Sequence, residues 1–125
     1  MIINVASVTG FRASPYSAVY SATKHAVVGL SYALRGELSG SGVKVCVVYP
    51  GVTAGTQFCD GTERPVGPQY PASWLANLIV RTARFPRRDA MVLPLRAGHL
   101  VEPLLGGLMD HALGEARRLV SPNLR

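Results

Sequence analysis

A chain of 125 residues has room for one small domain with a modest hydrophobic core. Hydrophobic residues make up 48% of it and charged residues 16%, a balance typical of folded globular proteins and not of disordered chains. The net charge is +6, but the basic residues are scattered and are not interleaved with aromatic side chains. This distribution argues against nucleic-acid binding.

The sequence favours a cytoplasmic protein. Met1 is followed at once by a strand-like segment, without the charged region of a signal peptide, and no apolar run approaches membrane-spanning length. Cys46 lies inside an apolar run and is expected to be a buried free thiol. The cysteines and the three histidines show no spacing typical of metal ligands, so we expect no metal site.

Four of the six residues in 2–7 are apolar and three of these are β-branched, without alternation, which predicts a strand covered on both faces of a parallel sheet. Residues 8–15 contain Gly, Ser and Pro and predict a loop. A helix is then expected over 17–38, ended by the Ser-Gly-Ser-Gly run at 39–42. Its spacing of apolar residues predicts a buried stripe formed by Val27, Leu30, Leu34 and Leu38.

Residues 43–49 carry the strongest strand pattern in the chain and end abruptly at Pro50–Gly51. A strand, a long helix and a second strand joined by short turns form a βαβ unit. Residues 52–71 are rich in Gly and Pro and predict a long loop. Such a loop is either a lid over a ligand or simply mobile.

A second amphipathic helix is expected over 72–84 and a third short strand over 90–94. The remainder predicts a helical tail, interrupted near Pro103 and Gly106–Gly107.

We expect residues 1–97 to form the domain and residues 98–125 to pack on it or on a partner. The alternative for this tail is a helix that binds a membrane surface or a partner, since Arg117–Arg118 lies beside an apolar stripe.

Three residues suggest a site for carbonyl or alcohol chemistry. Tyr20 and Lys24 are four residues apart and therefore share one face of the helix. A phenol is a poor acid or base near neutral pH, but an ammonium one turn away stabilises the phenolate. Ser7 lies at the end of the first strand, so a hydroxyl, a phenol and an ammonium converge if strand end and helix start meet.

Four features occur in register: Asn4 and Ser7 at the strand end, Tyr20 and Lys24 as a Y-x-x-x-K pair, thirteen residues between Ser7 and Tyr20, and Pro50–Gly51 after the next strand. In this combination the chain resembles the short-chain dehydrogenase/reductase family, from Ile2 to about Pro94. The resemblance implies an α/β fold with a Rossmann-like doubly wound parallel sheet. It covers the carboxyl-terminal half of that fold, about three strands and three to four helices.

The resemblance implies an NAD(P)-dependent oxidoreductase that interconverts a small-molecule alcohol and a carbonyl compound. Ser7 would hydrogen-bond the substrate oxygen, and Tyr20 would be the general acid in reduction and the general base in oxidation. Lys24 would stabilise the tyrosinate and bind the ribose hydroxyls of the nicotinamide nucleotide.

The resemblance also implies contacts to NAD or NADP beyond Tyr20 and Lys24. Pro50, Gly51 and Val52 would line the nicotinamide side, with the backbone of Val52 near the carboxamide. A threonine a few residues past the proline would touch the cofactor. Thr53 and Thr56 both lie near that place, and Thr56 is preferred.

The sequence departs from the family in one large respect. A dinucleotide site needs a glycine-rich turn between a strand and a helix, and none is present. The residues that choose between NAD and NADP are also absent, and the chain looks like the carboxyl-terminal half of the family's domain. The alternative function is therefore a non-catalytic fragment or assembly subunit. In either case the 17–38 helix is expected to mediate a homo-oligomer.

Overall fold

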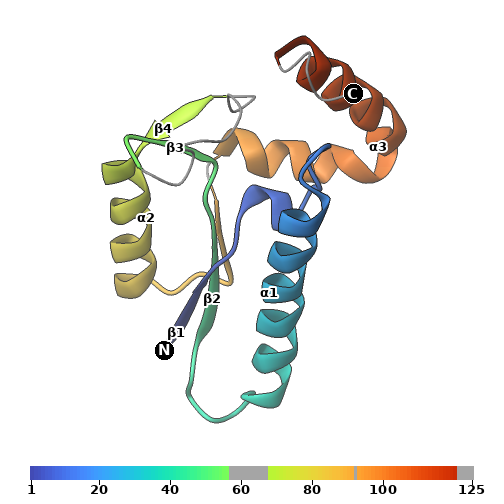
Figure 1. Ribbon diagram of the computed structural model, residues 1–125. Coiled ribbons are helices and arrows are strands. Elements are labelled where there is room, and N and C mark those ends of the chain that lie inside the picture. Colours follow the sequence, from blue (N-terminus) through green and yellow to red (C-terminus); the bar gives the residue numbers. More distant parts are fainter. Residues whose placement is uncertain (57–67, 92, 121–125) are drawn as a thin grey trace.

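The protein is described by a computed structural model that covers residues 1–56, 68–91 and 93–120, with the side chains of 93–103 not described. It is an α/β fold in which a parallel sheet is covered on both faces by helices (Figure 1). The elements in chain order are β1 (Ile2–Val5), the 3-10 helix η1 (Val8–Gly10), α1 (Ala18–Glu37), β2 (Val45–Tyr49), β3 (Val52–Ala54), β4 (Gln69–Pro71), α2 (Ala72–Arg84), β5 (Asp89–Met91) and α3 (Leu93–Val120).

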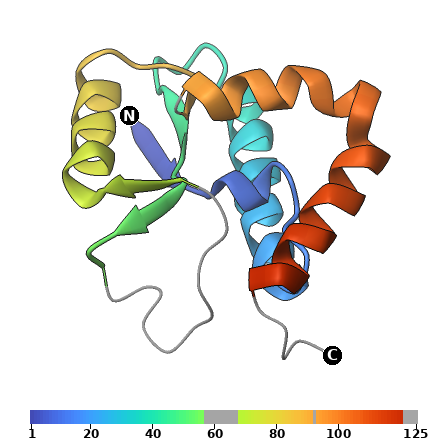
Figure 2. The same ribbon diagram turned by 90° about the horizontal axis from the view of Figure 1, so that it is seen from above.

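The main sheet has the order β1-β2-β5, and both neighbouring pairs are parallel. Helix α1 covers one face and α2 the other, which confirms the doubly wound arrangement (Figures 1 and 2). β2 is the central strand, and all five of its residues are buried. This double cover explains the unbroken apolar run of β2, because neither face of the strand meets solvent.

The predicted strands and helices agree with the structure except near two turns, in the predicted loop over 8–15, where Val8–Gly10 form η1, and in the burial predicted for β1. β1 was expected to be covered on both faces, but it is an edge strand of the described sheet, with Ile2 36% and Val5 42% exposed. The segment expected to be a loop over 52–71 begins and ends with short strands, β3 and β4, which pair in parallel with each other. The central part of the predicted lid, residues 57–67, lies outside the described residues. The third strand was placed too late: β5 ends at Met91, and Leu93 already begins α3. Proline is well tolerated in the first turn of a helix, so Pro94 is compatible with a helix that begins at Leu93.

The face of α1 that meets the sheet is more polar than the predicted stripe. Leu30 is 57% exposed, so its placement in the buried stripe was wrong, whereas Ser21 and Ser31 are fully buried. Val27 and Val28 pack against the core beside these serines. Small side chains let the helix backbone approach the sheet closely, and a pattern based on large apolar residues does not detect such a face.

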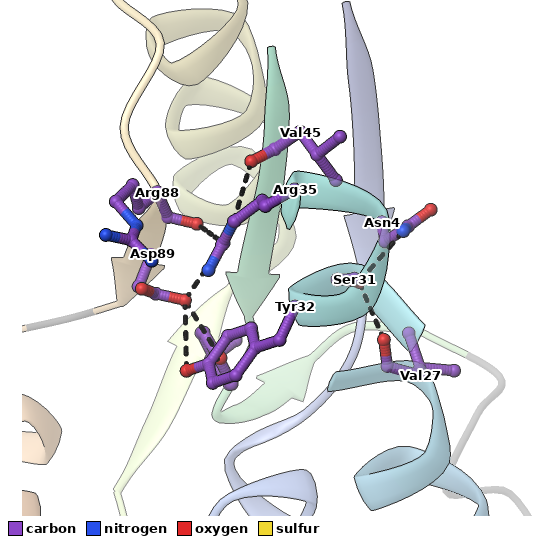
Figure 3. Close-up of polar contacts among 9 residues, drawn as sticks. Asn4, Val27, Ser31, Tyr32, Arg35, Val45, Arg88 and Asp89 are labelled. Atoms are coloured by element: carbon purple, nitrogen blue, oxygen red, sulfur yellow. Dashed lines mark hydrogen bonds and ion pairs between the residues drawn. The ribbon is translucent and has the colours of Figure 1, made fainter. Parts of the chain in front are cut away.

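Each buried hydroxyl on this face has a partner. The Ser31 hydroxyl donates to the carbonyl of Val27 at 2.6 Å and accepts from Nδ2 of Asn4 at 2.9 Å (Figure 3). The second contact joins α1 to β1. Because a buried hydroxyl without a partner is destabilising, this pairing makes the close approach of helix and sheet favourable.

At the amino-terminal end of β2, Arg35 ties α1 to two strands (Figure 3). Its Nε donates to the carbonyl of Val45 at 3.0 Å, and its Nη2 donates to the carbonyl of Arg88 and to Oδ1 of Asp89, the latter at 3.2 Å. The same Asp89 oxygen accepts from the Tyr49 hydroxyl at 3.0 Å. One guanidinium and one carboxylate therefore hold α1, β2 and β5 together.

Helix α3 bends where the sequence predicted an interruption. Leu105 has non-helical angles, φ −122° and ψ 16°, between Pro103 and Gly106–Gly107. Arg12 donates to the carbonyl of Gly106 at 3.0 Å and pairs with Asp110, which attaches the second half of α3 to the loop before α1. The boundary expected at residue 98 falls inside this helix, and the division into domain and tail stays a prediction. Among the described residues, no helix is both long and apolar enough to cross a bilayer.

The buried phenol of Tyr49 should make stability depend on alkaline pH. Burial raises the pKa of Tyr49, and the hydrogen bond with Tyr32 and the Asp89 carboxylate raise it further. The unfolded chain releases this proton near pH 10, whereas the folded protein retains it. The free energy of unfolding should therefore fall by about 1.4 kcal/mol per pH unit above about pH 10.

Urea unfolding of the wild type and Tyr49→Phe at a series of pH values tests this dependence. The variant lacks the phenol, so the difference in unfolding free energy between the two proteins should shrink as the pH rises above about 10. A difference that stays constant with pH would contradict the assigned cause.

Candidate active site

The candidate site lies where β1 and β2 end. Pairing between these strands continues past their last residues, because the Ala6 amide donates to the carbonyl of Val48 at 2.9 Å and the Val8 amide donates to that of Pro50 at 3.0 Å. The segment around Ser7 is thereby held beside the Pro50–Gly51 turn. Crevices at the carboxyl ends of parallel strands are the usual ligand sites of open α/β sheets.

Ser7 is fixed at this edge by the turn that follows it. It is 7% exposed and caps η1, with its Oγ accepting hydrogen bonds from the Thr9 amide at 3.2 Å and from the Thr9 hydroxyl at 3.0 Å. The side chain therefore has a defined position before any ligand arrives.

The first turn of α1 is held by the buried Ser21, whose Oγ accepts from the amide of Ser14 at 3.2 Å. This contact places the adjacent Tyr20. The ammonium of Lys24 lies 5.6 Å from the centroid of the Tyr20 ring and donates to the carbonyl of Val5 at 3.4 Å. Lys24 thus bridges the helix and the end of β1, with its charge near the phenol.

Gly10 lets η1 lie directly against α1. A Cβ atom at this position would stand 2.6 Å from the carbonyl oxygen of Lys24 and 2.7 Å from its carbonyl carbon. Both atoms belong to a helical backbone and cannot move aside alone. The absence of a side chain at Gly10 therefore sets the separation between the Ser7 segment and the Lys24 turn.

A cavity of about 350 Å³ opens between these elements. The predicted site residues all line it: Ser7, Tyr20, Lys24, Pro50, Gly51, Val52 and Thr56. Its volume lies within the range of small-molecule sites. A hydroxyl, a phenol and an ammonium meet there beside a largely apolar wall.

The cavity also has lining residues that the sequence did not single out. Thr9 lies within two residues of Ser7, and a hydroxyl at that spacing could have been recognised as a local partner of the serine side chain. Leu75 also reaches the cavity, from α2, for which the sequence predicted only an amphipathic helix. The two threonines that the sequence did single out, Thr53 and Thr56, also line the cavity. The Thr56 hydroxyl donates to the carbonyl of Thr53 at 3.3 Å.

A second cavity of about 550 Å³ lies at the opposite end of β2, against the carboxyl-terminal end of α1. Its lining includes Arg35, Lys44, Arg87 and Arg88 but none of the predicted site residues. Cations beside a helix carboxyl terminus offset the negative end of its dipole, which accounts for this charge without a ligand. Despite its greater volume, we do not take it as the reaction site.

A sequence model described as short chain dehydrogenase matches residues 1–65. This range is more than half of the chain and includes every residue predicted for the site. The chain belongs to the short-chain dehydrogenase family.

Curated relatives agree with this assignment over part of their length. An uncharacterized oxidoreductase of Staphylococcus epidermidis is 38% identical over 79 residues, which are 63% of this chain and 34% of that protein. One of Schizosaccharomyces pombe is 47% identical over 70 residues, covering 56% of this chain and 28% of the relative. The chain therefore spans about a third of the length of these relatives.

Solved short-chain dehydrogenases have the same fold. One from Burkholderia cenocepacia, in complex with NADP, superposes with a TM-score of 0.75 at 21% identity, over 90% of this chain and 46% of that protein. Another from Sphingobium yanoikuyae, in complex with NADPH, gives a TM-score of 0.64 at 26% identity over 99% of this chain and 45% of the other. The first likeness concerns the fold alone.

The close approach at Gly10 leads to a stability prediction. Gly10→Ala should lower the free energy of unfolding by about 1–3 kcal/mol, since the new methyl group would overlap the Lys24 backbone. Gly29→Ala is the matched control, because no atom lies within 4 Å of a Cβ built there and alanine favours the helix. Urea unfolding of both variants provides the comparison. Equal stabilities would show that the contact does not constrain the fold.

Proposed function

We propose that this chain supplies the proton-transfer part of an NAD(P)-dependent oxidoreductase that interconverts a small alcohol and a carbonyl compound. The observation that carries the proposal is the convergence of Ser7, Tyr20 and Lys24 on one cavity at the carboxyl ends of β1 and β2. Each of these side chains alone is common in proteins. Their meeting in one cavity of a short-chain dehydrogenase fold supports a shared chemical role.

In the direction of reduction, the carbonyl oxygen of the substrate lies between the hydroxyls of Ser7 and Tyr20. Reduced nicotinamide supplies the hydride to the carbonyl carbon when the cofactor is bound. The oxygen gains negative charge, which the Ser7 hydroxyl stabilises by hydrogen bonding. Tyr20 transfers its phenolic proton to that oxygen, so the alcohol leaves neutral and the tyrosinate remains until solvent returns the proton.

Lys24 has two roles in this proposal. Its ammonium, near the Tyr20 ring, stabilises the tyrosinate that proton transfer produces. The ammonium has three N–H donors and uses one of them for the Val5 carbonyl, so the others remain for the hydroxyls of a ribose. Oxidation of an alcohol runs through the same groups in reverse, with Tyr20 as the base.

The cavity fits the nicotinamide end of the cofactor. Lys24 would hold the ribose, and Gly51 and Val52 would lie along the nicotinamide ring, with Thr56 at the edge of the same wall. The pyrophosphate needs backbone amides at a glycine-rich turn, and the 125 residues contain no such turn. The residues present therefore fit the reactive end of NAD or NADP and do not select between them.

The role of Tyr20 is testable in the longest natural polypeptide that contains this chain. Tyr20→Phe removes the proton donor and should lower kcat by about 100- to 10,000-fold without unfolding the protein. Turnover would be followed by the loss of NADH or NADPH absorbance with acetophenone, cyclohexanone and ethyl acetoacetate as substrates.

Tyr32→Phe is the matched control, because Tyr32 lies on the same helix but does not line the 350 Å³ cavity. The substitution removes the same phenolic hydroxyl. It should retain wild-type turnover. Near-normal kcat in Tyr20→Phe would exclude the proposed acid.

A second proposal concerns assembly, which would also be the main role of the chain if it were not catalytic. The outer side of α1 exposes large apolar side chains, among them Val19 at 80% and Leu30 at 57%. Exposed apolar surface of this kind on a helix is typical of contacts between proteins. We propose that α1 joins copies of the chain into a homo-oligomer.

Light scattering after size exclusion tests this assembly. The wild type should contain more than one copy, and Leu30→Asp should shift it toward the monomer by placing a charge in the contact. Val80→Asp on α2 is the control, since Val80 is 50% exposed and outside α1. A monomeric wild type would contradict the proposal.

A further inference from the structure

The hydrogen bonds around Ser7 define which part a hydroxyl at this position can play. A serine oxygen has two acceptor positions and one hydrogen to donate. The amide and the hydroxyl of Thr9 both donate to Oγ of Ser7, at 3.2 Å and 3.0 Å. Both acceptor positions are therefore filled from one neighbouring residue.

The hydrogen of the Ser7 hydroxyl is left to point elsewhere. Among the residues that the structure describes, Thr9 is the hydrogen-bond partner of this side chain and acts as the donor in both bonds, and the side chain lines the 350 Å³ cavity. Ser7 is 7% exposed, so bulk water has little access to it. Because the side chain lines the cavity, a ligand there is within reach of this hydrogen.

We propose that Thr9 is a positioning residue that makes Ser7 a pure hydrogen-bond donor toward the substrate oxygen. This inference rests on the proposed function and adds to it a residue and a direction. An oxygen that only accepts, such as a carbonyl oxygen or the alkoxide formed from it, suits this arrangement. A Ser7 free to turn would instead alternate between donating and accepting.

The two donors of Thr9 contribute differently. The amide belongs to the backbone of η1 and is fixed by the fold, whereas the hydroxyl can be removed by substitution. Without it, one acceptor position of Ser7 is open and its hydroxyl hydrogen is no longer restricted to one direction. The bond from Ser7 strengthens as charge develops on the substrate oxygen, so losing its alignment should affect kcat more than KM.

Thr9→Val keeps the shape of the side chain and removes the hydroxyl. In the longest natural polypeptide containing this chain, with the carbonyl substrates named above, kcat should fall about fivefold with KM nearly constant. Thr9→Ser restores a hydroxyl and should recover most of the loss. Thr82→Val is the control, because Thr82 is buried in α2 and its hydroxyl bonds only to the carbonyl of Leu78.

A double-mutant cycle with Ser7→Ala separates positioning from general stability. If Thr9 acts through Ser7, Thr9→Val should have no further effect on kcat once Ser7 is alanine. A fivefold loss in that background as well would overturn the proposal, as would an unchanged kcat in Thr9→Val alone.

NMR provides a readout that does not depend on turnover. The couplings between the Hβ protons and the hydroxyl proton of Ser7 should report one hydroxyl orientation in the wild type and averaging in Thr9→Val, and Ser7→Ala should shift the Thr9 amide proton. Identical couplings in wild type and Thr9→Val would overturn the role of Thr9 even if the enzyme is active. If the couplings are as expected but the protein reduces no carbonyl compound, the positioning of Ser7 by Thr9 is supported and the proposed function is contradicted.

Discussion

The contact between Gly10 and the backbone of Lys24 is the constraint on which the candidate site depends. The Ser7 segment follows from β1 and the Tyr20 turn belongs to α1, so nothing in either element alone brings their side chains together. Because Gly10 has no side chain, η1 can contact the helix directly. A Cβ atom at this position would lie 2.6 Å from the carbonyl oxygen of Lys24. The same contact fixes how far the Ser7 hydroxyl lies from the phenol and the ammonium. The proton transfer proposed for this site would tolerate little displacement, which makes a glycine here more informative than one in a turn.

The rest of α1 follows the same principle of close approach. Its buried positions are Ser21 and Ser31, and each hydroxyl bonds to backbone or to a side chain across the contact. Larger apolar residues at these positions would push the helix away from the sheet and separate Tyr20 from the end of β1. The face is therefore polar for a geometric reason, and the usual preference for large apolar core residues is overridden.

Sequence patterns predicted the parts of the fold that repeat regularly. The buried run of β2 and the amphipathic period of α2 are long enough to identify their elements, and the spacing of Ser7, Tyr20 and Lys24 identified the residues that meet in the cavity. Leu30 was misplaced because the apolar pattern alone does not indicate which side of a helix faces the sheet. The pairing of β3 with β4 could not be predicted, since each strand has three residues and is held by its partner more than by its composition. Leu75 was not singled out because a side chain that lines a cavity and one that packs against other side chains give the same apolar pattern in an amphipathic helix.

The basic side chains of the fold differ from Lys24 in the partners that they have. Arg35 is paired with the carboxylate of Asp89, and Arg12 and Arg118 are paired with Asp110 and Glu115. Two of these pairs connect elements of the fold, since Arg35–Asp89 joins α1 to β5 and Arg12–Asp110 joins the loop before α1 to α3, whereas Arg118 and Glu115 lie on one helix. Lys24 differs, because its described partner is a backbone carbonyl at 3.4 Å and no described carboxylate pairs with it. The ammonium of Lys24, which no described carboxylate neutralises, lies beside the Tyr20 ring, where the proposed proton transfer would use its charge.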